Sequence, residues 1–364
     1  MTGPMRAVHG GAFFDALGED FAHLERRADI VNADVLDAWY DPSPRVMAAL
    51  QEHLPWLIKT SPPTHGDGLR RVIAEHRGIA SDQIVLGAGS STLMFSAFPR
   101  LLQRGEDAVI LDPMYGEYAH IVENLIGGTC RRFLLPESHF MPDIDALADF
   151  SAASRLVILV NPNSPTGVGL TRKDMGGLLN KLPPETCLWV DETYIDFMPG
   201  SESVEPLTRD FDNLIVSKSM SKFYALSGLR IGYLACSSSL ATQLSERNPP
   251  WAVGMLAQLA AVEALNDPGY YLERARETHQ LRTDLAADLD GIPGLATIPS
   301  TTNFLLMKFA ESLAEQVVLT AQKQGVFLRN CDSLSPRFQG RYIRTAVKSA
   351  SENAKIAAAV RSAI

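Results

Sequence analysis

Residues 217–232 read SKSMSKFYALSGLRIG, a stretch that runs from one short apolar segment, residues 214–216, into the next, residues 231–234. It places Lys222 among serines in an apolar neighbourhood, with Arg230 eight positions later. Burial and a nearby arginine both lower the pKa of a lysine amine, and a neutral amine can form a Schiff base with a carbonyl group. The alternative, a surface lysine in a serine-rich loop, fits the flanking apolar pattern poorly.

On either side of this stretch, short apolar runs alternate with segments of helical pattern. The runs that we predict as strands are residues 83–89, 108–111, 131–135, 156–160, 188–190, 214–216 and 231–234. Near-continuous apolar strands between helices indicate an α/β fold with a mostly parallel sheet covered on both faces. In such sheets ligands bind beyond the carboxyl ends of the strands, so functional residues are expected there.

The first two runs are followed by candidate cofactor contacts. A turn of small residues, GAGSST at residues 87–92, leads into a helix. Its Gly89, Ser90 and Ser91 could cradle a phosphate with backbone N–H groups and hydroxyls, although such turns are also common without a ligand. Tyr115 follows the second run, and simple core packing is the alternative reading of this aromatic residue.

Two later runs also end in polar residues. The loop NPNSPTG, residues 161–167, includes Asn163 and Ser164 and is more elaborate than a plain turn. The segment DETY places Asp191 directly at a buried strand end, with Tyr194 three positions on. A lone aspartate in that position is often a helix cap, so Asp191 is ambiguous by itself.

The composition excludes several classes of protein. The 364 residues include 33 basic and 42 acidic side chains, a formal net charge of −9, which argues against a nucleic-acid or anionic-membrane surface. At about 150 residues per domain, the length indicates roughly two domains. No apolar run approaches the roughly 20 residues of a membrane span, and the start has no signal-peptide pattern. The four cysteines lack the spacing of a disulfide framework or zinc site, so we expect reduced thiols, no metal and a cytoplasmic location.

Together the motifs resemble the fold-type-I pyridoxal 5′-phosphate (PLP) enzymes, the class I/II aminotransferases. In chain order they are Gly89-Ser90-Ser91, Tyr115, NPNSPTG, Asp191-x-x-Tyr194, Ser219-x-x-Lys222 and Arg230. The resemblance runs from about residue 44 to the C-terminus. Within this superfamily the chain is most similar to the branch that holds histidinol-phosphate aminotransferase and threonine-phosphate decarboxylase. Residues 9–11, 248–253, 328–331 and 341–347 resemble the decarboxylase in particular.

The resemblance implies a role for each cofactor-facing residue. Lys222 would bind PLP and later act as general base and acid at the substrate α-carbon. Asp191 would keep the pyridine nitrogen protonated, Tyr194 would hydrogen-bond the ring hydroxyl, and Tyr115 would stack on the ring. The cofactor-binding residues that we predict are Gly89, Ser90, Ser91, Tyr115, Asn163, Ser164, Asp191, Tyr194, Ser219, Lys222 and Arg230. Of these, Ser90, Ser91, Ser219 and Arg230 would hold the phosphate.

The substrate-facing residues are less uniform. Arg344 would bind the substrate α-carboxylate, with Asn303 nearby. Arg329 could read a second acidic group, and His9, with two glycines after it, resembles a substrate-facing start. On an ordinary N-terminus, however, a histidine carries no such meaning.

Three departures from the family pattern concern the substrate more than the cofactor. Ser164 stands where an asparagine usually contacts the ring hydroxyl, and Ser61 stands where a tyrosine usually reaches the neighbouring subunit's phosphate. A phosphate-reading segment is replaced by residues 32–40, NADVLDAWY, which bring Asp34 and Asp37. These carboxylates would repel a phosphate and favour a cationic side chain. The other reading makes them surface or capping residues of a linker.

The expected architecture is aspartate-aminotransferase-like: a three-layer α/β/α domain with a mostly parallel seven-stranded sheet, plus a small α/β domain. We predict an N-terminal segment (1–45) that packs with the small domain, a large PLP domain (46–265) and a small C-terminal domain (266–364). The last helix is expected from residue 352, with Ser351 as its cap. Family members are usually homodimers with sites at the interface, and we expect the same here.

The reaction expected from the resemblance joins an amino acid to PLP as an external aldimine and forms a carbanion at the α-carbon. Transamination is the default outcome for the superfamily, and decarboxylation is the outcome of the nearest branch. A third outcome is elimination, replacement or cyclisation at Cβ or Cγ of a cationic amino acid with a guanidinium or sulfonium group. A non-enzymatic binding domain is disfavoured by the intact set of Lys222, Asp191, Arg230 and Arg344.

Overall fold

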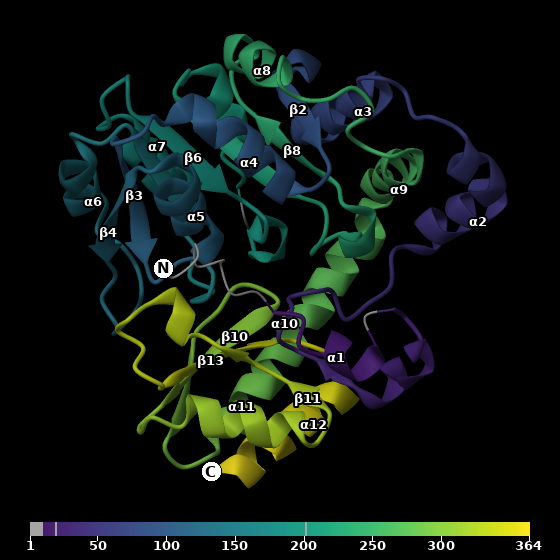
Figure 1. Ribbon diagram of the computed structural model, residues 1–364, viewed down its shortest axis with the longest axis vertical. Helices are drawn as coiled ribbons and strands as arrows, with labels where there is room; N and C mark the ends of the chain where they lie inside the picture. Colours follow the sequence, from purple (N-terminus) through teal and green to yellow (C-terminus); the bar gives the residue numbers. More distant parts are fainter. Residues whose placement is uncertain (1–9, 19, 201) are drawn as a thin grey trace.

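A seven-stranded sheet forms the centre of the computed structural model, which describes residues 10–18, 20–200 and 202–364 (Figure 1). The strand order is β2-β8-β7-β6-β5-β3-β4. The strands are β2 (Ile84–Gly87), β3 (Asp107–Asp112), β4 (Thr129–Leu134), β5 (Leu156–Val160), β6 (Cys187–Asp191), β7 (Leu214–Ser219) and β8 (Gly232–Ala235). Neighbours run parallel except β8, which is antiparallel to both β2 and β7. The predicted α/β fold with a mostly parallel seven-stranded sheet is confirmed.

The middle of this sheet is covered on both faces. Every residue of β5 and of β7 is buried, and successive side chains of a strand point to opposite faces. Helices packed on the sheet account for this burial. The helices of this part of the chain are α2 (Pro44–Lys59), α3 (Asp67–Arg77), α4 (Ser90–Leu101), α5 (Gly116–His120), α6 (Ile144–Ser151), α7 (Arg172–Leu179), α8 (Ser238–Ser245) and α9 (Met255–Leu265).

The long helix α10 (Pro268–Asp290) leads into a second, smaller sheet (Figure 1). This sheet is antiparallel, in the order β12-β13-β10-β9. Its strands are β9 (Leu295–Ile298), β10 (Phe304–Phe309), β12 (Arg329–Asn330) and β13 (Tyr342–Ala346), accompanied by helices α11 (Ala314–Gln322) and α12 (Ala350–Ala363).

The N-terminal segment joins the C-terminal part of the chain. Strand β1 (Val31–Asn32) pairs in parallel with β11 (Val326–Phe327), and Figure 1 shows this segment, with the short helix α1 (Phe14–Leu17), beside the C-terminal elements. The boundaries near residues 45 and 265 stay predictions, but this pairing puts the segment around β1 beside the C-terminal elements.

The start of α12 differs from the prediction. The helix begins at Ala350, and Ser349 caps it: the Ser349 side chain accepts a hydrogen bond from the Glu352 amide, and the Glu352 side chain accepts one from the Ser349 amide. The expected cap, Ser351, was therefore wrong. A serine three residues before a glutamate forms a reciprocal capping box, which distinguishes Ser349 from its neighbour.

Candidate active site

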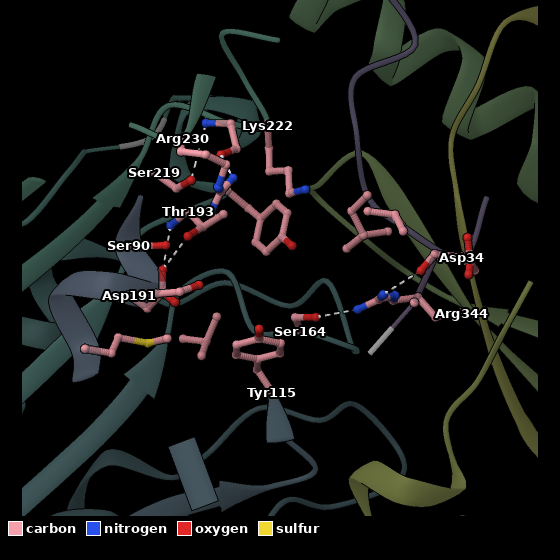
Figure 2. A pocket seen from close by; sticks show the side chains of 18 residues that line it. Asp34, Ser90, Tyr115, Ser164, Asp191, Thr193, Ser219, Lys222, Arg230 and Arg344 are labelled. Carbon is pink, nitrogen blue, oxygen red and sulfur yellow. Dashed lines mark hydrogen bonds between the residues drawn. The ribbon is translucent and has the colours of Figure 1, made fainter. Parts of the chain in front are cut away.

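A cavity of about 230 Å³ lies where the large sheet faces the C-terminal part of the chain. Its walls come from the carboxyl ends of β5, β6 and β7, from the first turn of α4, from β13 and from the segment after β1. The predicted site residues that line it are Asp34, Ser90, Ser91, Tyr115, Ser164, Asp191, Tyr194, Ser219, Lys222, Arg230 and Arg344 (Figure 2). The cavity therefore lies at the sheet edge where the sequence predicted functional residues.

Lys222 lies on the loop after β7 and reaches into this cavity with its amine (Figure 2). The side chain is 17% exposed, and its Nζ donates to Asp37 Oδ1 at 2.9 Å. Burial lowers the pKa of the Lys222 amine, and the Asp37 carboxylate opposes this shift without cancelling it. A lysine with a lowered pKa loses its proton more readily, as a nucleophile must.

Asp191 ends β6 and is buried. Its Oδ2 accepts a hydrogen bond from the Tyr118 hydroxyl at 2.7 Å, and its Oδ1 accepts from the Thr193 amide at 2.9 Å and the Thr193 hydroxyl at 2.6 Å. Burial raises the pKa of Asp191, against these hydrogen bonds, which lower it. A carboxylate has about four acceptor positions, so one remains for a further donor in the cavity.

The first turn of α4 and Arg230 form an anion cradle. Gly89, with φ +87°, precedes the helix, and a Cβ on it would lie 2.6 Å from Arg230 Nη2. A Cβ on Gly232 would lie 2.8 Å from the Ser90 amide nitrogen. The two glycines therefore allow strand, helix and guanidinium to approach closely. Free N–H groups at a helix start, serine hydroxyls and an arginine together suit a phosphate dianion.

Two tyrosines line the cavity between these groups. Tyr115 precedes α5, and its ring packs edge-on against Tyr118, with ring centroids 6.0 Å apart. Burial raises the pKa of Tyr115 to about 12. Burial also raises the pKa of Tyr194, although nearby Arg344 opposes that shift. Both phenols are therefore protonated at neutral pH.

Arg344 on β13 forms the wall opposite the large sheet (Figure 2). Its Nη1 donates to Ser164 Oγ at 3.0 Å and its Nη2 donates to the Asp34 backbone carbonyl at 3.1 Å. The side chain is buried, and its Nε has no hydrogen-bond partner within the described residues. A guanidinium has five N–H donors, so Arg344 can still bind an anionic group.

The two carboxylates of the N-terminal segment have different surroundings. The Asp34 side chain accepts hydrogen bonds from the amides of Gly11 and Ala12, at 2.6 and 3.1 Å, and Figure 2 shows it turned away from the cavity. Asp37 instead pairs with Lys222. The Asp34 carboxylate is thus bound by backbone amides of the N-terminal segment, whereas the Asp37 carboxylate is bound by the cavity lysine.

Five predicted residues lie outside the lining of the cavity, and one is not described. Gly89 precedes the anion cradle, Asp37 contacts Lys222, and the others are Asn163, Asn303 and Arg329. The Asn163 amide donates to the Pro113 carbonyl at 3.0 Å, and the Asn303 amide donates to the Leu36 carbonyl at 3.1 Å. Arg329 pairs with Ser333 at 3.1 Å and lies next to Arg344 across the β12–β13 ladder. Asn163 and Asn303 thus each donate to a backbone carbonyl beside the cavity. His9 lies outside the described residues.

Tyr118, Thr193 and Ser221 were not predicted. The first two fix Asp191, while Thr193 and Ser221 also line the cavity. Thr193 is inside the DETY segment and follows Asp191 by two positions, the spacing of a local side-chain-to-amide turn. Tyr118 lies in the first turn of α5, three positions after Tyr115, which precedes the helix. Those two spacings were the available signals.

The described residues contain no group of three or more His, Cys, Asp or Glu side chains placed to hold a metal ion. Across the same part of the chain, no helix has the length and apolar content needed to cross a membrane.

The fold and the residues of the cavity fit a PLP-dependent enzyme. The chain matches the model of the family "Aminotransferase class I and II" over residues 30–362, and it belongs to that family. The assignment to fold-type-I PLP-dependent enzymes is thereby confirmed.

Similar sequences and solved structures support this family assignment. A histidinol-phosphate aminotransferase of Carboxydothermus hydrogenoformans is 31% identical over 322 residues, 86% of this chain and 87% of the relative. Among solved structures, the histidinol-phosphate aminotransferase of Sinorhizobium meliloti in complex with PLP superposes with a TM-score of 0.87 at 22% identity, over 99% of this chain and 95% of that one. The L-threonine-O-3-phosphate decarboxylase of Porphyromonas gingivalis gives 0.79 at 22% identity, over 92% and 99%. These two structures share the fold.

Proposed function

We propose that the protein is an aminotransferase that moves an amino group between PLP and an amino-acid substrate, with the substrate's anionic group bound to Arg344. The observation that carries this proposal is the convergence in one cavity of the Lys222 amine, the buried Asp191 carboxylate and the Arg344 guanidinium (Figure 2). The named relatives support transamination over the other outcomes of the same site.

The residues present fit the cofactor. The anion cradle suits its phosphate, and the remaining acceptor position of Asp191 suits a protonated ring nitrogen. Tyr115 offers a ring face and Tyr194 a phenol donor. When bound, PLP supplies an electron sink for the charge left at the substrate α-carbon.

Each protein group then has a defined task. Lys222 takes a proton from the substrate α-carbon and returns one, which its lowered pKa permits. Asp191 holds the proton on the ring nitrogen, and Tyr118 and Thr193 hold Asp191. Arg344 orients the substrate, with Ser164 and the Asp34 carbonyl fixing its guanidinium. Asn163, Asn303, Arg329 and His9 stay predictions as direct ligands.

The alternative is decarboxylation, or elimination, replacement or cyclisation at Cβ or Cγ of a cationic amino acid. The Asp37 carboxylate at the cavity lysine is the observation that favours a cationic substrate. Asp34 does not decide the question: its Oδ2 accepts two amide hydrogen bonds, while its buried Oδ1 has no partner within the described residues.

We also propose a homodimer with the sites at the interface, working in the cytoplasm. Leu54, Trp56 and Ile58 on α2 are 42%, 52% and 68% exposed, an apolar surface that a second copy would cover. The exposed Arg230 would become enclosed in the same way. Four free cysteines, two of them buried, suit a reducing compartment.

Borohydride reduction tests the cofactor assignment. The reduced holoenzyme should carry the cofactor on the Lys222 peptide, and Lys222→Ala should carry none, while the exposed Lys355→Ala serves as a matched control. A colourless protein, or reduced cofactor retained by Lys222→Ala, would reject the assignment.

A product panel tests the reaction. The enzyme is incubated with histidinol phosphate, phosphothreonine, arginine and neutral amino acids, and products are followed by mass. A keto product with pyridoxamine phosphate supports transamination. Carbon dioxide, or an altered side chain without a keto product, supports the alternative and overturns the proposal.

A further inference from the structure

Asp37 is held from three sides beside the cavity lysine. Its Oδ1 accepts hydrogen bonds from Lys222 Nζ at 2.9 Å and from Ser227 Oγ at 2.6 Å. Its backbone carbonyl accepts from Lys348 Nζ at 3.3 Å. Lys348 follows β13 and is 6% exposed, so a buried amine from the C-terminal part fixes the segment that presents Asp37.

Asp37 is the carboxylate that contacts Lys222, and several positive groups surround this pair. The positive groups that act on Lys222 or its carboxylate come from separate elements: Arg344 on β13, Arg230 before β8, and Lys348 after β13. Tyr194, after β6, faces Asp37 as a phenol. Asp34, the other carboxylate of this segment, accepts its hydrogen bonds from Gly11 and Ala12.

The ionisation of the pair follows from these surroundings. Burial alone would raise the pKa of Asp37, but Lys222, Ser227 and Lys348 together bring it below its usual value. Burial lowers the pKa of Lys348, as it does that of Lys222. Asp37 is therefore ionised at neutral pH and favours the protonated form of Lys222.

We propose that Asp37 is a positioning residue for Lys222, which it holds as an ammonium group in the cavity whenever that amine is not bonded to the cofactor. The inference rests on the proposed role of Lys222. In the proton transfer, the C–H bond at the substrate α-carbon breaks, its electron pair stays with the substrate and cofactor, and an N–H bond forms on Lys222. Asp37 stabilises the resulting positive charge and keeps the proton within reach for its return.

The first test measures the Lys222 amine without using activity. Full-length protein freed of cofactor is treated with an amine-specific reagent over a range of pH, and labelling of the Lys222 peptide is followed by mass. In Asp37→Asn the half-labelling pH should fall by about one unit, a tenfold change in proton affinity. Asp37→Glu should restore part of the shift. Asp41→Asn removes the same charge from an exposed residue of the same segment, and it should leave the half-labelling pH of Lys222 unchanged.

The second test uses the holoenzyme. Asp37→Asn should reduce kcat by about ten- to a hundredfold with a smaller change in KM. Lys348→Met removes a competing positive charge, so it should move the Lys222 labelling in the opposite direction. Thermal unfolding of each variant shows whether it folds.

The outcomes separate the two proposals. If the Lys222 peptide of folded Asp37→Asn is labelled with the pH dependence of wild type, the positioning role is overturned. If Asp37→Asn changes KM alone, Asp37 contacts substrate instead, which also overturns it. If borohydride fails to fix the cofactor to Lys222 of wild type, the proposed function fails, whatever the labelling of Lys222 shows.

Discussion

Lys218 and Lys222 are four residues apart, yet their surroundings differ completely. Lys218 lies on β7 with its side chain 2% exposed, and its Nζ is 3.3 Å from Glu192, 3.7 Å from Asp196 and 3.7 Å from Glu205. Lys222, on the following loop, has one carboxylate partner and opens into a cavity. One lysine has its charge compensated several times over, and the other has it compensated once.

The alternation of a strand explains how both environments arise. Ser219 faces the cavity, so its neighbour Lys218 points to the opposite face of the sheet. There Arg77 completes the ion cluster through two hydrogen bonds to Asp196, at 2.9 and 3.1 Å. Removing one member of such a buried cluster leaves the others uncompensated, whereas a lysine with a single partner and adjacent space can react. The contrast predicts different consequences for each substitution.

The largest effect is expected from Lys222→Ala. Loss of the amine that moves the proton should reduce kcat/KM by about 10⁴-fold, with little change in thermal unfolding because the side chain faces a cavity. Steady-state kinetics and calorimetry measure the two quantities. Near-normal turnover by this variant would show that Lys222 does not take part in the reaction, and the proposed functional difference between Lys218 and Lys222 would be wrong.

Lys218→Met should have the reverse profile. Removing one partner of a buried ion cluster leaves carboxylates uncompensated, which costs about 3–5 kcal/mol of unfolding free energy. Urea unfolding of the folded holoenzyme measures it, with the exposed Lys355→Met as a control for loss of charge. A stability within about 1 kcal/mol of wild type would show that the cluster tolerates the loss.

A smaller effect is expected from Arg344→Lys. The lysine keeps the charge but loses the forked geometry, so kcat/KM should fall about ten- to a hundredfold, or about 1.4–2.7 kcal/mol. The loss should be specific to substrates with the anionic group. Equal losses for an analogue without that group would indicate damage to the wall instead of lost substrate binding.

The smallest effect concerns acid stability. Burial alone would raise the pKa of Asp196, but Arg77 and Lys218 hold it well below the ordinary value. This stability is present above the unfolded-state pKa of about 4 and is lost as the pH falls through the folded-state pKa. Unfolding free energy measured from pH 6 downward should therefore decline less in Asp196→Asn. Parallel pH profiles for the two proteins would contradict this assignment.

The sequence predicted what local pattern determines. Apolar runs marked the strands, and the polar residues directly after them, such as Asp191 and Tyr194, lie where parallel strands end. The sequence could not predict contacts between residues that are distant along the chain. Asp37 and Lys222 are 185 positions apart, and no local spacing indicates their contact.

Side-chain amides were the other source of difference. Asn163 and Asn303 stay predictions as ligands: their amide nitrogens donate to backbone carbonyls, while their buried amide oxygens have no partner within the described residues. A sequence shows that an amide is present but not which way it points, because buried carbonyls compete for the same donors. The residues that fix Asp191 were missed for a related reason, since Tyr118 looks like any core aromatic residue.

The pairing of β1 with β11 affects the order in which parts of the enzyme can fold during synthesis. Val31 emerges early, but its partner Val326 emerges only near the end of synthesis. The seven strands of the large sheet, with the anion cradle, are complete by Ala235. The wall with Asp37 and Arg344 must wait for the C-terminal strands. Nascent chains released after α10 should therefore contain the phosphate cradle and lack the surface that selects and positions the substrate.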